Sequence, residues 1–204
     1  MALEIGNVRD RLVDAALRVL RDEGATSLTV RRIADAAGSS TMGIYSRFGS
    51  RERILEAVYL RGFEMLRSAL AEVGDGPDVP GQLVDLGLAC RGFALGNPAL
   101  YGLMFERPVP GFDPALPVRQ EALRMTFGYL VGAVQRGIDT GLIRDGDASR
   151  TSYLLWCVVH GVVSLELTHA ARGPVAGSHF ARPEDGASML VDAVSATIAG
   201  LRAA

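Results

Sequence analysis

The stretch from Val30 to Phe48, VRRIADAAGSSTMGIYSRF, constrains the fold of this chain more than any other part of the sequence. Its first half places apolar residues three and four positions apart, which is the spacing of one helix face. Gly38 follows and can adopt the positive φ angle that a tight helix end requires. A second apolar face, carried by Ile44 and Phe48, comes after the turn. The pattern predicts two short helices that cross closely, which is the arrangement of a helix-turn-helix.

The charge around this stretch favours nucleic acid as a partner. The whole chain has a net charge of −2, yet residues 29–53 contain five arginines against two acidic residues. A basic patch attracts phosphates, although five arginines on a helical surface can also be ordinary solvated charge. The helix-turn-helix spacing in the same stretch strengthens the interpretation of this patch as a nucleic-acid-binding surface. Sequence-specific DNA binding is therefore the leading hypothesis.

The rest of the chain has helical and not strand periodicity, so an all-α fold of about nine helices is predicted. We expect an N-terminal three-helix helix-turn-helix module over residues 1–60, joined through a long fourth helix to a larger helical domain over residues 61–204. Glycines, prolines and capping residues mark the helix ends, and Gly74–Gly81 is predicted to be a loop. The expected helices are Val8–Asp22, Val30–Ala37, Thr41–Arg47, Arg51–Val73, Gln82–Leu95, Pro98–Phe105, Ala115–Thr140, Ala148–Ala171 and Pro183–Arg202.

Cysteine usage and hydropathy indicate a cytoplasmic protein. Cys90 and Cys157 both lie in apolar runs, which predicts buried free thiols in a reducing compartment. The N-terminal sequence MALEIGNVRD lacks the positive start and apolar core of a signal peptide. The strongest apolar run, Tyr153–Leu167, is short and is interrupted by His160 and Glu166. It is predicted to be a buried helix and not a membrane span, so no membrane partner is expected.

Residues 9–60 resemble the DNA-binding domain of the TetR-type (tetracycline repressor-like) transcriptional regulators. The matching segments are RLVDAALRVLRDEG, LTVRRIADAAG and GIYSRFGSRERILEAV, in order and at fixed spacing. That family has a Tyr within the recognition helix and a Phe that closes it, which are Tyr45 and Phe48 here. A Ser-Lys or Ser-Arg pair opens the fourth helix, which is Ser50-Arg51 here. Ser39 departs from the family, which usually has an apolar residue at this place, and this weakens the packing of the turn.

The C-terminal part is similar to a subgroup of that family with a Trp-x-x-x-His-Gly motif. The motif corresponds to Trp156, His160 and Gly161, and the stretch NPALYGLMF at residues 97–105 is also similar. The resemblance implies a ligand-sensing and dimerisation domain. It also implies that the last two helices form a four-helix interface in a homodimer.

The residues of the recognition helix that cannot be core are expected to face DNA. Thr41 and Met42 would reach base edges or thymine methyl groups, and Gly43 would permit close approach. The resemblance implies that Tyr45 contacts a phosphate through its hydroxyl group. The predicted DNA-binding residues are Thr29, Arg32, Ser40, Thr41, Met42, Gly43, Tyr45, Ser46, Arg47 and Arg51.

Two of these predictions have a structural alternative. Thr29 stands where the helix that begins at Val30 needs an N-cap, and capping is compatible with a phosphate contact. Arg31 and Arg32 stand at helical spacing from Asp35, so an ion pair within the helix is as plausible as a DNA contact.

The C-terminal helices carry many bulky apolar residues, most of which serve as core. Methionines and aromatic residues also line adaptable pockets, so some of these residues are candidates for binding an apolar ligand. A hydrogen-bonded core or interface histidine is the alternative for His160. The candidate pocket residues are Met65, Phe93, Leu103, Met104, Phe127, Trp156 and His160. The candidate dimer-interface residues are Gly161, Leu165, Leu190, Val194 and Ile198.

These observations predict a homodimeric regulator of transcription. In this interpretation it is a repressor that leaves a palindromic double-stranded DNA operator when a small apolar effector binds. A DNA-binding protein without ligand control and an activator are the alternatives. An enzyme is disfavoured, because the three histidines occur without a nucleophile motif, a phosphate-binding loop or metal-ligand spacing. Neither a metal nor a cofactor is therefore predicted.

Overall fold

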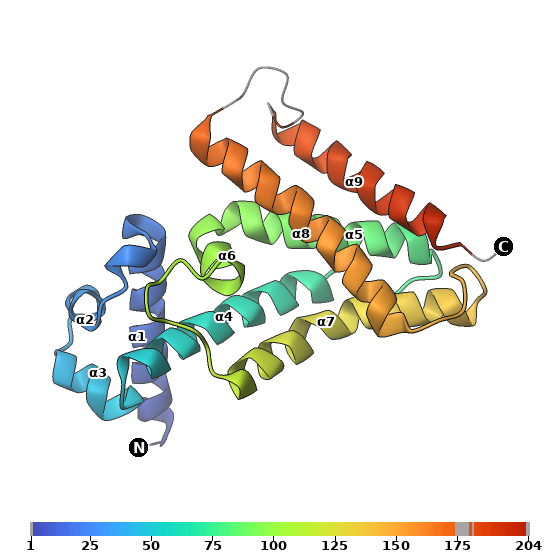
Figure 1. Ribbon diagram of the computed structural model, residues 1–204. Coiled ribbons are helices and arrows are strands. Elements are labelled where there is room, and N and C mark those ends of the chain that lie inside the picture. The colour runs from blue at the N-terminus through green and yellow to red at the C-terminus, as the bar shows by residue number, and fades with distance from the viewer. Residues whose placement is uncertain (1, 174–179, 181, 203–204) are drawn as a thin grey trace. The chain divides into compact units, whose positions relative to one another are not determined.

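The computed structural model describes residues 2–173, 180 and 182–202. Over these residues the regular structure is helical, with one isolated bridge between Ile143 and Arg202 (Figure 1). The helices are α1 (Ala2–Glu23), the 3-10 helix η1 (Ala25–Ser27), α2 (Val30–Ala37), α3 (Thr41–Phe48), α4 (Arg51–Ala71), α5 (Val79–Gly96), α6 (Pro98–Phe105), α7 (Leu116–Asp139), α8 (Ala148–Arg172) and α9 (Pro183–Gly200). The predicted all-α fold is confirmed.

Two helices begin earlier than predicted: α1 begins at Ala2 and not at Val8, and α5 begins at Val79 and not at Gln82. Helix α5 thus begins inside the stretch Gly74–Gly81 that was predicted to be a loop. The Asp78 carboxylate accepts a hydrogen bond from the Gly81 backbone N–H at 3.1 Å and so caps the first turn. Pro80 fits there because the first-turn N–H groups have no intrahelical acceptor to lose. The loop prediction is therefore wrong at its C-terminal end.

The chain divides into two compact units, residues 1–65 with 97–123 and residues 66–96 with 124–204. Helix α6 belongs to the first unit, where it packs closely on α4 at Gly62. A Cβ atom at Gly62 would lie 2.6 Å from the sulfur of Met104 and 3.1 Å from Leu100, so this approach requires a residue without a side chain. The division at residue 60 stays a prediction about functional domains.

In the first unit, α2 packs along α1, and α3 follows α2 across the turn (Figure 1). The contact is apolar and closely packed. Its buried residues are Leu12, Ala15, Ala16, Val19 and Leu20 of α1, Ile33 and Ala34 of α2, and Ile44 and Phe48 of α3. Burial of each larger aliphatic side chain contributes about 1.5–3 kcal/mol, and this is what gives the short helices fixed positions.

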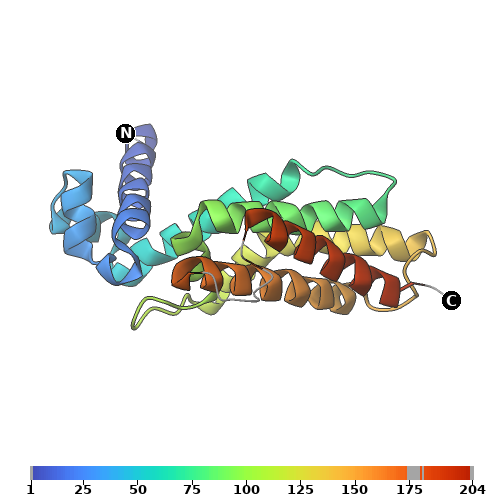
Figure 2. The same ribbon diagram turned by 90° about the horizontal axis from the view of Figure 1, so that it is seen from above.

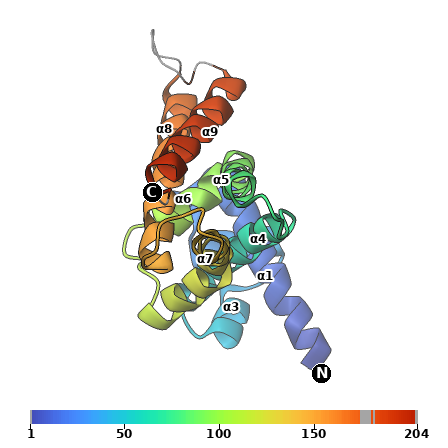
Figure 3. The same cartoon turned by 90° about the vertical axis from the view of Figure 1, so that its right-hand side faces the viewer.

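In the second unit, α5, α8 and α9 pack on one another (Figure 2). They meet at Gly87 of α5, where a Cβ atom would lie 3.3 Å from Val159 of α8 and 3.6 Å from Leu190 of α9. Helices α8 and α9 lie side by side as a pair (Figures 1 and 3). One side of α9 is therefore core, and part of the surface of α8 is left uncovered.

Candidate nucleic-acid interface

The backbone of the turn sets the helix-turn-helix geometry. Gly38 adopts the left-handed conformation, with φ 60° and ψ 38°, and ends α2. Its N–H bonds back to the carbonyl groups of Ala34 and Asp35. Ser40 then starts α3, because its hydroxyl oxygen accepts a hydrogen bond from the Gly43 N–H at 3.0 Å. The predicted turn is therefore confirmed, with glycine at the position that needs a positive φ angle.

Helix α3 has one buried face and one exposed face. Ile44 and Phe48 are buried. On the other side, 73% of Met42 and 46% of Tyr45 are exposed, although both are large and partly apolar. The predicted contacts Thr41, Ser46 and Arg47 are also exposed. Exposed large side chains on the second helix of such a motif are positioned to read base edges in a major groove.

Gly43 is half-buried in the first turn of α3, beside the two serines of the turn. A Cβ atom there would lie 2.7 Å from the Ser39 hydroxyl oxygen and 3.4 Å from that of Ser40. The residue was predicted to allow close approach to DNA. The structure adds that it makes room for the two serines of the turn.

Thr29 and Ser40, both predicted phosphate contacts, are N-caps. The Thr29 hydroxyl oxygen accepts from the Arg32 N–H at 3.2 Å, and Ser40 caps α3 in the same way. Both residues are exposed. A hydroxyl group that accepts one hydrogen bond keeps its own O–H as a donor, so capping leaves a donor for a phosphate oxygen. The capping role predicted for Thr29 is thus observed, and the phosphate contact stays a prediction.

Arg32 forms an ion pair, but with a partner other than the expected one. Its guanidinium group donates to the Glu23 carboxylate at 2.9 and 2.7 Å from Nε and at 2.6 Å from Nη2. The hydrogen-bonded partner is therefore Glu23 and not Asp35, the alternative considered from the sequence, because the chain brings the end of α1 beside the first turn of α2. The hydrogen bond from Arg32 also lowers the pKa of the Glu23 carboxyl. A phosphate that binds Arg32 must share it with Glu23 or displace Glu23.

The last two predicted contacts are Arg47, near the C-terminal end of α3, and Arg51, at the start of α4. The Arg47 side chain is exposed and lies back along α3, with Nη1 3.3 Å from the Ser46 hydroxyl oxygen. Arg51 is half-buried in the first turn of α4. That turn is capped by Ser50, whose hydroxyl oxygen accepts from the Arg53 N–H at 3.3 Å. Exposed backbone N–H groups at such a helix start favour a phosphate.

Sequence reasoning missed two arginines of α1 that touch the motif. Arg9 donates to the Arg47 carbonyl oxygen at 2.7 Å, and Arg18 donates to the Ala36 carbonyl oxygen at 3.3 Å. No sequence signal marks them, since each partner is a backbone atom far along the chain. Both arginines thus hydrogen-bond to the backbone of the two helices that form the motif.

The candidate pocket residues fall into both compact units. In the first unit, Leu103 and Met104 are buried in the core and Met65 is on the surface, 36% exposed. In the second unit, Phe93 is buried. The other three, Phe127, Trp156 and His160, belong to one cluster of rings. The seven candidate residues thus belong to two different units.

The ring cluster of the second unit joins α7 and α8. The centroid of Phe127 lies 4.6 Å from that of Tyr153 and 5.8 Å from that of Trp156, so these rings pack on one another. His160 meets the edge of Trp156 with the centroids 5.0 Å apart. Burial lowers the pKa of His160 to about 4, so the imidazole is neutral near pH 7. The cluster is mostly apolar and contains one uncharged polar ring.

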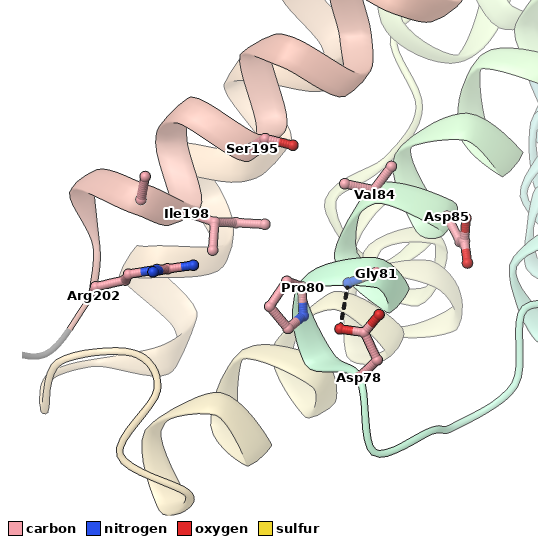
Figure 4. A pocket seen from close by; sticks show the side chains of 9 residues that line it. Asp78, Pro80, Gly81, Val84, Asp85, Ser195, Ile198 and Arg202 are labelled. Atoms are coloured by element: carbon pink, nitrogen blue, oxygen red, sulfur yellow. Dashed lines mark hydrogen bonds between the residues drawn. The ribbon is translucent and has the colours of Figure 1, made fainter.

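A cavity of about 340 Å³ opens between the start of α5 and the end of α9, in the second unit (Figure 4). Asp78, Pro80 and Gly81 line one side, and Ser195, Ile198 and Arg202 line the other. None of the seven candidate pocket residues lines it. The cavity is therefore a separate feature of the C-terminal unit.

Helix α8 has an exposed stripe along one face, which we name the α8 stripe. It consists of Tyr153, Leu154, Cys157, Gly161 and Leu165. The spacing of three and four residues places the last four on one side of the helix. Gly161 and Leu165, predicted to lie at a dimer interface, belong to this stripe. The prediction of a buried helix over Tyr153–Leu167 is wrong for this face.

The other three predicted interface residues, Leu190, Val194 and Ile198, are buried within the chain itself. Their prediction as interface residues is wrong, because α9 turns this side toward α5 and α8. The two cysteines also differ from one another. Cys90 is buried, and burial raises its thiol pKa to about 12, whereas Cys157 is exposed and was predicted to be buried.

The described residues contain no group of three or more His, Cys, Asp or Glu side chains that could hold a metal ion. One helix, Ala148–Arg172, is long and apolar enough by length and composition to cross a membrane. This helix is α8, and its buried Glu166 forms an ion pair with Arg91 of α5 at 2.6 Å.

Comparison with known proteins gives consistent matches over both parts of the chain. Residues 12–58 match the model of bacterial regulatory proteins of the tetR family, and residues 83–194 match a tetracyclin repressor-like C-terminal domain. The HTH-type transcriptional regulator Rv1816 of Mycobacterium tuberculosis is 24% identical over 188 residues, covering 78% of this chain and 80% of that protein.

Solved structures share the fold. A protein of unknown function from Rhodococcus sp. RHA1 aligns with a TM-score of 0.76 and 27% identity over 95% of both chains. The transcriptional regulator FadR from Bacillus subtilis, in complex with stearoyl-CoA, aligns with a TM-score of 0.72 and 19% identity, covering 94% of this chain and 98% of that one. The narrower motif resemblance through Trp156, His160 and Gly161 stays a prediction.

Proposed function

Because the chain belongs to the tetracycline repressor-like family and is a DNA-binding regulator of transcription, we propose that it is a homodimeric, cytoplasmic repressor that leaves its operator when a small apolar molecule binds. The observation that carries the DNA-binding part is the exposed face of α3. Met42 and Tyr45 are largely uncovered there, while Ile44 and Phe48 anchor the opposite face. This arrangement allows the helix to enter a major groove.

We assign different roles to the exposed residues of the motif. Thr41 and Met42 read bases, since a hydroxyl group can hydrogen-bond to a base edge and a thioether can pack on a thymine methyl group. Tyr45, Thr29 and Ser40 contact phosphates through hydroxyl groups, and these contacts set the register without selecting sequence. Arg47 and Arg51 supply positive charge. The remaining predicted contacts are Arg32 in α2 and Gly43 and Ser46 in α3.

The α8 stripe supports the proposal of a homodimer. Leu154 and Leu165 are 46% and 54% exposed in the single chain. Gly161 between them has nothing within 4 Å of its Cβ position, so a second helix can approach closely there. A second copy of the same stripe, related by a twofold axis, would cover these side chains. The two recognition helices of such a dimer would read half-sites about 34–36 Å apart in a palindromic operator.

The ring cluster of Phe127, Tyr153, Trp156 and His160 supports an apolar effector. It lies between α7 and α8, and it contains three of the predicted pocket residues. A ligand that separates these rings would change the packing of α8. In a dimer built on α8, this would bias the distance between the recognition helices, which is a shift of populations between two states. The tight packing of the rings favours a second candidate, a regulator without ligand control.

The direct test is selection of DNA by the purified chain from a pool of random duplexes, followed by footprinting. We expect enrichment of a palindrome and protection of two half-sites on one side of the duplex. The Met42→Ala variant should relax the preference at one position of each half-site. Failure to enrich any duplex, with the protein folded and dimeric, contradicts the proposal. Screening apolar compounds for release of the enriched duplex then separates ligand control from its absence.

A further inference from the structure

Helix α1 reaches the C-terminal ends of both helices of the motif with arginine side chains. Arg18 donates to the carbonyl oxygen of Ala36 at 3.3 Å, and Arg9 donates to that of Arg47 at 2.7 Å. Both carbonyl groups lie in the last turn of a helix, where the C=O groups lack an intrahelical N–H partner. A positive charge there also meets the negative end of the helix dipole. α1 therefore caps α2 and α3 from outside.

The contact of Arg9 is the more extensive of the two. Besides its hydrogen bond to Arg47, the guanidinium carbon lies 4.3 Å from the centroid of the Phe48 ring. This is a cation–π distance, and Phe48 is one of the two buried anchors of α3. Arg9 thus holds the last turn of the recognition helix by its backbone and by a side chain together.

Helix α3 depends on such external support. It has 8 residues, which is too short for a stable helix in isolation. Its N-terminal end is fixed by the Ser40 cap and by the turn to α2. Its C-terminal end is fixed by Phe48 and by Arg9. The orientation of α3, and with it the direction of Met42 and Thr41, is therefore set partly by an arginine on another helix.

We propose that Arg9 is a positioning residue for sequence recognition by α3. It acts through Arg47 and Phe48 and not by contacting a base. Loss of Arg9 frees the last turn of α3, so base edges are read with poorer geometry and the discrimination between operators falls. This inference rests on the proposed role of α3 as the recognition helix. It differs from a role as a phosphate anchor, which would change affinity equally for all sequences.

The test compares Arg9→Gln with Arg11→Gln. Arg11 lies on the same helix, is exposed, and has no polar contact among the described residues, so the two variants lose the same charge. The first measurement needs no DNA: amide hydrogen exchange of the peptide that covers residues 41–49, in the full chain. The second is affinity for the duplex that the wild-type protein selects from a random pool, and for its single-base-pair variants, over a range of salt concentrations.

For Arg9→Gln we expect hydrogen exchange over residues 41–49 to become about tenfold faster. We also expect the affinity for the selected duplex to fall about five- to tenfold, and the loss of affinity caused by a single-base-pair change to become smaller. For Arg11→Gln we expect neither faster exchange nor a smaller loss of affinity from a single-base-pair change. Equal behaviour of the two variants overturns the proposal. A second result also overturns it. If the slope of log affinity against log salt concentration is lower in magnitude by about 0.9 for Arg9→Gln than for Arg11→Gln, while hydrogen exchange and the affinity losses for single-base changes are unchanged, Arg9 is a phosphate contact.

Two further measurements distinguish failure of the proposal about Arg9 from misfolding of the variant and from failure of the proposed function. If circular dichroism shows that Arg9→Gln does not fold, Arg9→Lys is compared with Arg11→Lys. Lysine keeps the charge but lacks the planar group that stacks on Phe48, so a smaller loss in the same direction is expected, and equality overturns the proposal. If the wild-type chain selects no duplex, the proposed function and the recognition role fail together, while hydrogen exchange still shows whether Arg9 holds α3.

Discussion

Arg91 of α5 and Glu166 of α8 form an ion pair with two hydrogen bonds inside the second unit. The Nε–Oε2 distance is 2.8 Å and the Nη2–Oε1 distance is 2.6 Å. Only 12% of the Arg91 side chain and 9% of the Glu166 side chain are exposed. The Glu166 carboxylate also lies against Gly186 in the first turn of α9, where the helix dipole favours negative charge. Three helices therefore meet at one carboxylate.

Replacing Glu166 by Leu should destabilise the chain by about 3–5 kcal/mol, because it removes the carboxylate that pairs with the buried guanidinium group of Arg91. Urea unfolding followed by circular dichroism measures the loss. The control is Asp113→Asn, which removes an exposed ion pair with Arg107 and should cost at most about 1 kcal/mol. A loss for Glu166→Leu as small as that of the control would contradict a structural role for the buried pair.

Gly186→Ala should also destabilise the chain, by about 1–3 kcal/mol, since the new methyl group would meet the buried Glu166 carboxylate. The matched control is Gly92→Ala in α5, where nothing lies within 4 Å of the Cβ position. That change should stabilise the chain by about 0.5–1 kcal/mol through helix propensity. Thermal unfolding of both variants checks the opposite signs, and two changes of the same sign would count against the packing described here.

Tyr45→Phe should weaken DNA binding by about three- to tenfold and equally for all sequences, because a hydroxyl bond to phosphate carries no base information. The measurement is affinity for the selected duplex and for its single-base variants. Tyr129→Phe, which removes a hydroxyl from a half-buried tyrosine of α7, is the control and should bind like the wild type. A loss confined to one base position would assign Tyr45 to base reading instead.

Leu165→Glu should shift the chain from dimer to monomer and raise the dimer dissociation constant at least about tenfold, since a charge would enter an apolar contact. Analytical ultracentrifugation measures the change. Leu116 lies at the start of α7 and is 59% exposed, compared with 54% for Leu165. Leu116→Glu is thus the matched control and should leave the association unchanged. Equal effects of both changes would exclude the α8 stripe as the interface.

The stability of the chain should fall as the pH is lowered from about 6.5 to about 4, the interval between the unfolded and folded pKa of His160. Burial lowers the folded pKa, so within this interval the unfolded chain binds the proton and the folded chain does not. The loss approaches about 3 kcal/mol below pH 4. His160→Gln should flatten the dependence of the urea-unfolding midpoint on pH, compared with the wild type. An unchanged slope in His160→Gln would refute the assignment.

Much of the architecture follows from local rules that can be read in the sequence. Gly38 predicted the left-handed end of α2, and the periodicity of Ile44 and Phe48 predicted the buried face of α3. Helix ends at Phe105 and Asp147 follow from proline and capping residues. These features depend on residues a few positions apart, so the sequence alone determined most of the helices, the motif and hence the family.

Contacts between distant residues were decided only by the tertiary structure. The pairing of Arg32 with Glu23 in place of Asp35 depends on how α1 and α2 meet. The contacts of Arg9 with Arg47 and of Arg91 with Glu166 join residues 38 and 75 positions apart. Leu165 and Leu190 are both apolar residues on amphipathic helices, yet one is exposed and the other is buried. Periodicity shows that a helix has an apolar face, but packing decides whether that face meets the core of its own chain or is left for a partner.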